Sequence, residues 1–237
     1  ISLLKFEPAI KELFQQKSQS KLNQSFLETV LALSELPLLL KLMSICPLND
    51  LELEKGLTDI RSCLLLSVLQ LTASTEVLRF QSALALQCFT NEYVYEQTDS
   101  ETKALKVLEA SVKKPLSNGE QPSPQLILCL ASYNALHEYE WCDLLAVTGD
   151  TEEVFTRQVI EPQKEGHLKS NIPALKEITD TVSSKVREQY EGSPYPRWVN
   201  LGLRFKPAPI SKVSDEIKLR LFDNKINKVE APDILIA

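Results

Sequence analysis

Apolar residues recur every three or four positions along most of the first 160 residues, the spacing that places them on one face of an α-helix. The clearest stripe consists of Leu53, Leu57, Ile60, Leu64 and Val68. The same periodicity continues in shorter stretches toward the C-terminus. It predicts helices at residues 3–16, 22–45, 51–68, 75–95, 100–113, 124–147, 151–162, 182–192 and 211–224.

Residues that start or stop helices divide this pattern. The second helical stretch is predicted to break before Pro37, because proline disfavours helical backbone in the residue that precedes it. Asn49 or Asp50 can cap the next helix, and Thr75 can cap the one that follows. We expect Pro162 to end a helix that begins near residue 151.

Two regions are predicted. Residues 1–180 form a mainly α domain, an irregular multi-helix bundle, with solenoid-like helix pairs as the second arrangement. The 34-residue tetratricopeptide pattern is not present. We expect a loop at 113–124, which is dense in turn-forming residues, and irregular structure at 163–180. Residues 181–237 add a helix, an extended segment and one apolar terminal strand at 234–236.

Composition narrows the function classes. Apolar residues make up 43% of the 237 residues, enough for a large core, and a net charge of −6 argues against a general nucleic-acid-binding protein. The apolar runs are too short to span a membrane. The five cysteines are widely spaced and contain no C-x-x-C pair. We therefore expect reduced core cysteines in a cytoplasmic protein.

Motifs for catalysis or metal binding are missing. The chain has no glycine-rich phosphate or dinucleotide loop and no H-E-x-x-H. His137 and His167 lie far apart, and no cysteine stands at zinc-ligand spacing from either. Cys142 follows His137 by five positions, which is a weak arrangement for a nucleophile and its base. We predict no catalytic residue and no metal site in this chain.

One short stretch is unusually rich in aromatic residues and prolines. Residues 186–200 read VREQYEGSPYPRWVN. In one interpretation the aromatic side chains anchor a linker onto the helical body. In the other, the prolines hold the backbone extended, so that the segment forms a lid over a pocket for a planar or anionic ligand. The candidate lid residues are Tyr190, Pro194, Tyr195, Pro196, Arg197 and Trp198.

The stretch VREQYEGSPYPRWV resembles a segment found in a group of S-adenosylmethionine-dependent methyltransferases that are described as tetratricopeptide-repeat-associated. The resemblance extends to LLLKLMSICPLNDLELEKGLTDIRSCLL, ALALQCFTNEYVY and IPALKEITDTVSSKVREQY, and thus covers roughly residues 25–237. Its most specific part is YEGSPYPRW.

The resemblance implies that PDILIA is the first strand of a Rossmann-like methyltransferase domain, which in that group continues into a glycine-rich cofactor turn. The sequence stops at Ala237, before such a turn. We therefore expect a longer enzyme that binds S-adenosylmethionine, with its cofactor-binding residues outside this chain. The helical region would cover or regulate the missing methyltransferase domain or recruit its substrate, and would be inactive alone. One alternative is a non-enzymatic helical scaffold that binds a protein partner. A further alternative is an all-helical enzyme whose site is made from residues distant in sequence.

Overall fold

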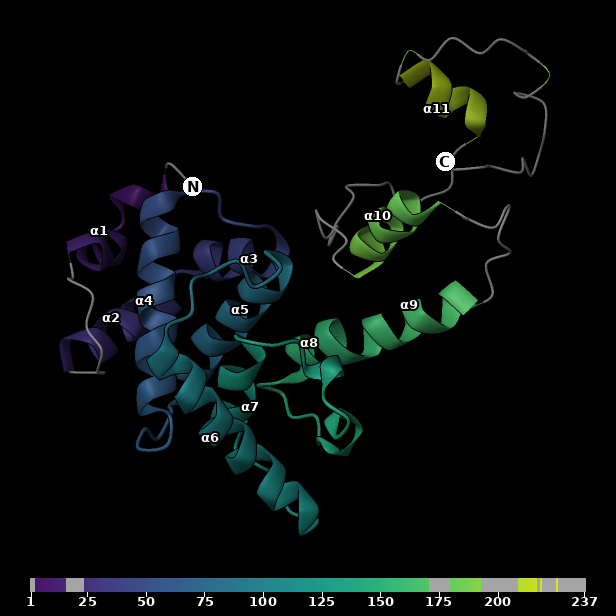
Figure 1. The fold of residues 1–237 in the computed structure, drawn as a ribbon. Helices are drawn as coiled ribbons and strands as arrows, with labels where there is room; N and C mark the ends of the chain where they lie inside the picture. The colour runs from purple at the N-terminus through teal and green to yellow at the C-terminus, as the bar shows by residue number, and fades with distance from the viewer. Residues whose placement is uncertain are drawn as a thin grey trace. The chain divides into compact units, whose positions relative to one another are not determined.

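The computed structural model describes residues 3–15, 24–170, 180–192 and 209–216, together with residues 218 and 225. Every regular element in these ranges is a helix, so the predicted mainly α, multi-helix fold is confirmed (Figure 1). Two compact units comprise residues 1–199 and 200–237. The strand at 234–236 and the boundary at residue 180 stay predictions, because residues 171–179 and 226–237 lie outside the described ranges.

The α-helices in chain order are α1 Pro8–Gln15, α2 Gln24–Ser34, α3 Pro37–Ile45, α4 Leu51–Ser67, α5 Thr75–Thr90, α6 Asp99–Ser117, α7 Pro124–Ala131, α8 Glu152–Phe155, α9 Glu161–Ser170, α10 Thr181–Gly192 and α11 Ile210–Glu216. Short 3₁₀ turns occur at Leu4–Phe6, Leu136–Glu138 and Cys142–Leu144, and a π-helical turn at Thr156–Ile160 joins α8 to α9.

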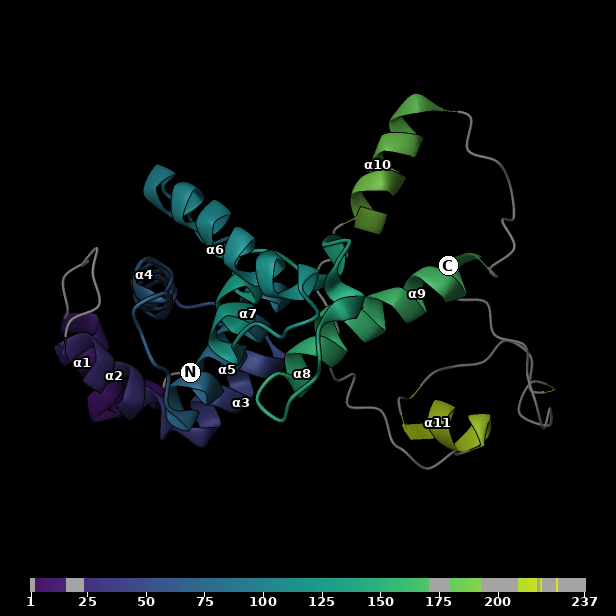
Figure 2. The same cartoon turned by 90° about the horizontal axis from the view of Figure 1, so that it is seen from below.

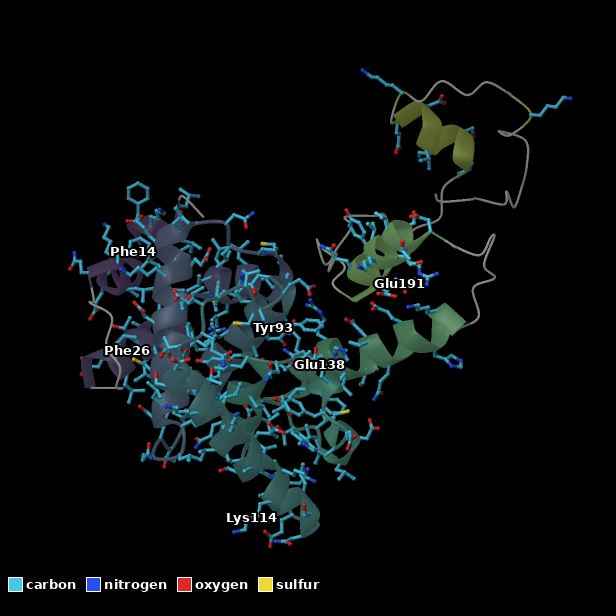
Figure 3. All side chains as sticks on the ribbon, in the orientation of Figure 1. Phe14, Phe26, Tyr93, Lys114, Glu138 and Glu191 are labelled. Carbon is cyan, nitrogen blue, oxygen red and sulfur yellow. The ribbon has the colours of Figure 1, made fainter. Side chains whose placement is uncertain are left out.

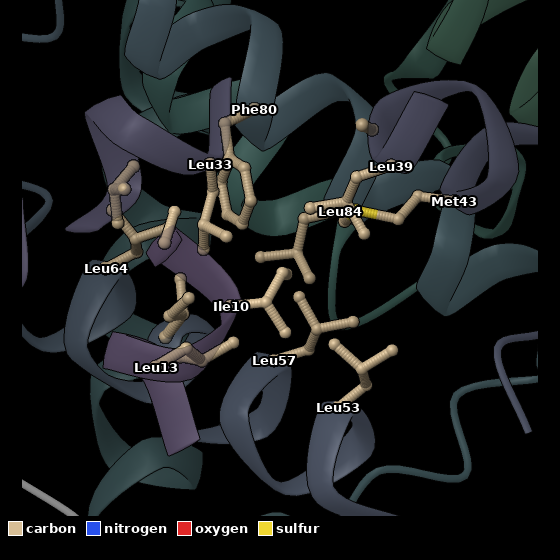
Figure 4. Close-up of a cluster of buried hydrophobic side chains, with 14 of the residues drawn as sticks. Ile10, Leu13, Leu33, Leu39, Met43, Leu53, Leu57, Leu64, Phe80 and Leu84 are labelled. Carbon is tan, nitrogen blue, oxygen red and sulfur yellow. The ribbon is translucent and has the colours of Figure 1, made fainter. Parts of the chain in front are cut away.

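Helix α5 is the centre of the helical body. It packs against α2, α3, α7 and α8, and Figures 1 and 2 show it among these helices. Eleven of its sixteen residues are buried, so that it is buried on nearly all sides. The side chains of Phe80 and Leu84 enter one hydrophobic cluster with α1–α4, whereas Ala85 and Leu86 enter a second cluster with α6–α8. Figure 4 shows the first cluster around Ile10.

The predicted stripe on α4 is confirmed, because Leu53, Leu57, Ile60, Leu64 and Val68 are all buried in the core. Of the two predicted capping residues, Asp50 is the one that caps α4. Its Oδ1 accepts a hydrogen bond from the N–H of Leu53 at 3.2 Å.

The cap predicted for α5 at Thr75 is wrong by one residue. Ser74 has extended backbone angles and its Oγ accepts from the N–H of Val77, whereas Thr75 is already helical. The helix also ends at Thr90 rather than near residue 95, because Glu92 and Tyr93 adopt positive φ angles of 58° and 55°.

Helix α6 is longer than the sequence pattern indicated. It runs through Pro115 to Ser117, so the predicted loop at 113–124 begins only after the helix (Figure 3, near Lys114). The reason is burial: Leu116 continues the buried stripe of Leu108 and Val112 into the second hydrophobic cluster. That contact favours a last helical turn despite the proline.

The stretch at 124–147, predicted as one helix, is helical only to Ala131. It continues as two 3₁₀ turns, which contain the buried residues Leu136 and Cys142. Tyr139 stacks on Trp141 with ring centroids 4.6 Å apart, and this aromatic contact stabilises the irregular backbone.

The helix predicted to stop at Pro162 continues to Ser170, through the π-helical turn and α9. In an α-helix the N–H of residue 162 would donate to the carbonyl of Gln158, and proline has no N–H. The imidazole of His137 supplies a donor to this carbonyl: Nδ1 lies 2.9 Å from the Gln158 carbonyl oxygen. A carbonyl oxygen only accepts, so Nδ1 donates.

Candidate functional site

A pocket with a volume of about 620 Å³ lies against α5 between Thr75 and Leu86; we call it the α5 pocket. Its base includes Ala83 and Leu86 of α5. One side comes from α3, with Lys41 and Ser44, and another from residues 149–153 at the start of α8. Figures 1 and 2 show α3, α5 and α8 next to one another. The volume is in the range typical of ligand-binding pockets.

Charged groups of both signs line this pocket. Arg79 Nη2 lies 3.3 Å from Glu35 Oε1, and both side chains are more than half exposed, so water screens this pair strongly. Within the described part of the chain no ion pair involves Lys41, Asp150 or Glu153. One ammonium and two carboxylates are therefore available to a ligand.

The two sides of the pocket are held together by Arg157, which is 9% exposed. Its Nη1 donates to the carbonyl oxygen of Ser44 at 2.9 Å, and its Nη2 donates to Thr90 Oγ1 at 3.4 Å. Its Nε lies 3.4 Å from Glu161 Oε2. Arg157 thus connects the end of α3 to the helix that carries Glu153.

Gln158 is fully buried and fixes the same helix to the core. Its Nε2 donates to the carbonyl oxygens of Ala85 and Ala131, and its Oε1 accepts from the N–H of Leu136. A π turn holds more residues than an α turn, which allows the consecutive side chains of 157–159 to be buried together. The position of the pocket's α8 side is therefore set by buried hydrogen bonds.

The weak nucleophile–base pair considered from the sequence does not assemble. His137 Nδ1 donates to the Gln158 carbonyl, and the Sγ of Cys142 lies 3.8 Å from Asp143 Oδ1. Burial, with the neighbouring Asp143 carboxylate, raises the pKa of the Cys142 thiol. A thiol with a raised pKa is a poor nucleophile.

Three other core cysteines also have thiol pKa values that burial raises. Burial raises the pKa of Cys63 to about 11 and the pKa values of Cys88 and Cys129 to about 12. These thiols stay protonated near neutral pH and act as small apolar residues. Four of the five cysteines are buried and Cys46 is half-buried, and no disulfide joins them, all five being in the described part of the chain.

A second set of buried polar contacts surrounds Arg61, which is 1% exposed. Its Nη2 donates to the carbonyl oxygens of Tyr95 and Glu96 at 3.3 and 2.7 Å, and its guanidinium carbon lies 4.2 Å from the ring centroid of Tyr133. The hydroxyl of Tyr133 donates to Glu101 Oε1 at 2.6 Å. This group joins α4, α6 and the chain that connects α5 to α6.

Sequence reasoning missed this group, although part of its signal is visible. Thr98 and Glu101 form a capping box at the start of α6, with the T-x-x-E spacing that marks such a helix start. Nothing in the spacing indicates that Glu101 also binds Tyr133. Arg61 lies between apolar residues of α4, where a charged side chain usually indicates a solvent-exposed position.

The predicted lid residues are mostly outside the described ranges. Tyr190 lies in the last turn of α10 and is 68% exposed. Pro194, Tyr195, Pro196, Arg197 and Trp198 lie outside the described residues, so the lid stays a prediction. Val182 and Val186 precede Tyr190 at four-residue spacing and are also exposed, and together they give α10 one apolar face.

Among the described residues, no three His, Cys, Asp or Glu side chains gather in a way that could hold a metal ion. No described helix has both the length and the apolar character needed to cross a bilayer. Comparisons with protein-family models, with curated proteins and with solved structures found no match to this chain.

Proposed function

We propose that this chain is the helical region of a class I S-adenosylmethionine-dependent methyltransferase, and that it covers or regulates the catalytic domain or recruits its substrate. The proposal includes a cytoplasmic location and S-adenosylmethionine as the cofactor of the parent enzyme. It rests on the resemblance of YEGSPYPRW and of the apolar run PDILIA to the corresponding parts of that group.

The structural observation that supports the proposal is the exposure of Tyr190 at the end of α10. Tyr190 opens the aromatic–proline segment, and with Val182 and Val186 it presents apolar surface to solvent. An exposed apolar helix face of this kind is a feature of surfaces that pack against another domain. We propose that this face contacts the methyltransferase domain.

The chemistry of the described residues supports a binding role rather than a catalytic one. The buried thiols have raised pKa values, and His137 is engaged by a backbone carbonyl. The α5 pocket offers charged groups and apolar surface to a ligand. The methyl transfer itself would take place in the catalytic domain.

The test is calorimetric titration of S-adenosylmethionine into the protein made from the natural reading frame that contains this chain, and into residues 1–237 alone. We expect binding only by the longer protein. Substituting Tyr190, Tyr195 and Trp198 by alanine should weaken cofactor or substrate binding. Phe6→Ala is the matched control, because Phe6 is an aromatic residue with 71% exposure at the other end of the chain.

Two outcomes would contradict the proposal: no cofactor binding by the longer protein, or unchanged binding and turnover in the folded triple variant. The second candidate function, a helical scaffold for a protein partner, is favoured by the α5 pocket, which needs no catalytic domain for its formation. A scaffold would bind its partner through residues 1–237 alone and would not bind S-adenosylmethionine.

A further inference from the structure

The α5 pocket is formed before any ligand binds. Arg157 ties its α3 side to the helix that carries Glu153, and Gln158 ties that helix to the α5 backbone. Both anchoring side chains are buried. A pocket with fixed sides loses little conformational freedom when a ligand enters, which favours specific binding.

Two of the four hydroxyl groups that line the pocket, those of Ser34 and Ser44, already have hydrogen-bond partners. Ser34 Oγ donates to the carbonyl of Leu31 at 2.6 Å, and Ser44 Oγ donates to the carbonyl of Lys41 at 2.9 Å, both within their own helices. Leu40, Ala83 and Leu86 leave the base largely apolar. Recognition in this pocket therefore depends on an apolar group at the base and on charges at the sides.

Those charges are divided between different elements. Asp150 and Glu153 come from the start of α8, and Lys41 comes from α3. Because no ion pair within the described residues neutralises these three groups, a complementary ligand carries positive charge toward α8 and negative charge toward α3. A net excess of carboxylates makes the pocket unsuitable for a simple anion.

We infer that the α5 pocket binds a short peptide segment of a partner protein, in which one apolar side chain lies between an acidic residue on one side and basic residues on the other. The apolar side chain packs on Ala83 and Leu86, the basic side chains pair with Asp150 and Glu153, and the acidic one pairs with Lys41. This inference names the kind of partner that the second candidate function, a helical scaffold, would bind, and it requires neither a methyltransferase domain nor a cofactor.

The test uses the whole 237-residue chain and two synthetic peptides labelled with fluorescein, acetyl-Asp-Gly-Leu-Lys-Lys-amide and acetyl-Asp-Gly-Leu-Asp-Asp-amide, in which acidic residues replace the two basic ones. Fluorescence anisotropy measures binding. We expect the first peptide to bind about tenfold more tightly than the second. Glu153→Lys should remove this preference, whereas Glu152→Lys should keep it, because Glu152 is an exposed neighbour that does not line the pocket.

Circular dichroism establishes that both variants are folded. Equal binding of the two peptides, no binding of either at millimolar concentration, or equal losses in Glu153→Lys and Glu152→Lys would each overturn the inference. None of these results depends on S-adenosylmethionine. A failure here is thus distinct from a failure of the proposed methyltransferase role, which the cofactor titration measures separately.

Discussion

His137 donates from Nδ1 to the carbonyl oxygen of Gln158, 2.9 Å away, and Pro162 cannot supply the N–H that an α-helix would direct at this carbonyl. The hydrogen bond lies where the helical path passes from α8 through the π-helical turn into α9, close to Pro162. It also connects the 3₁₀ turn at Leu136–Glu138 to the π-helical turn at Thr156–Ile160.

His137→Ala should therefore lower the free energy of unfolding by about 1 kcal/mol, the contribution of a typical hydrogen bond. The decisive measurement is a double-mutant cycle with Pro162→Ala, in which urea denaturation gives the free energy of unfolding of each protein. Pro162→Ala restores an N–H to the helix, so the loss caused by His137→Ala should become smaller in that background. Equal losses in both backgrounds would mean that His137 stabilises the protein in another way.

Gln158→Leu should be more destabilising, by about 2 kcal/mol, because it removes the hydrogen bonds to the carbonyls of Ala85 and Ala131 and leaves the buried N–H of Leu136 without its Oε1 acceptor. Gln163→Leu is the matched control, since the amide of Gln163 binds Asp143 at an exposed position. Urea midpoints of the two variants provide the comparison. Similar small losses would show that the buried amide is not an important anchor.

The Glu101 carboxyl should make the free energy of unfolding fall at acidic pH. Burial alone raises its pKa, but hydrogen bonds from Tyr133 and Thr98 outweigh that effect, so the pKa lies below the ordinary value of 4.5. A depressed pKa in the folded state contributes stability above pH 4.5, and this contribution is lost as the pH falls through the folded-state pKa.

Urea denaturation of Glu101→Gln between pH 3 and pH 7 tests this effect. We expect the variant to be less stable than the unmodified chain at neutral pH, with a smaller further loss on acidification. Glu109→Gln, on the same helix and outside the hydrogen-bonded group, should keep the full acid dependence. A parallel pH dependence in the chain and in Glu101→Gln would refute this role for the carboxyl.

Thiol labelling should distinguish Cys46 from the other cysteines. Cys46 is half-buried, whereas the four others are buried, and burial raises the pKa values of Cys63, Cys88 and Cys129. With iodoacetamide at pH 8, mass spectrometry should find one modification before unfolding and none in Cys46→Ser. Rapid modification of several thiols in the native protein would contradict the packing of the core.

Sequence periodicity was sufficient where packing follows one helix face. The stripe from Leu53 to Val68 and the break at Pro37 are both present in the structure. Periodicity failed where contacts from residues distant in sequence decide where a helix ends. Pro115 and Pro162 are accommodated by the burial of Leu116 and by His137, and neither compensation is visible in the neighbouring sequence.

The candidate site was harder to predict for the same reason. The α5 pocket takes its sides from α3, α5 and residues 149–153, which are distant in sequence, and each contributes only one or two charged groups. No local motif indicates this combination. The aromatic–proline segment was recognisable because its residues lie close together in sequence, and of its six candidate lid residues only Tyr190 is described.

Helix α5 supplies side chains to both hydrophobic clusters, and this has a consequence for how the protein unfolds. If α1–α4 detached, Phe80 and Leu84 would be exposed to water; if α6–α8 detached, Ala85 and Leu86 would be exposed. Neither half can lose its structure without removing part of the other's packing. The helical body should therefore melt as a single cooperative unit, with the slowest amide hydrogen exchange in α5.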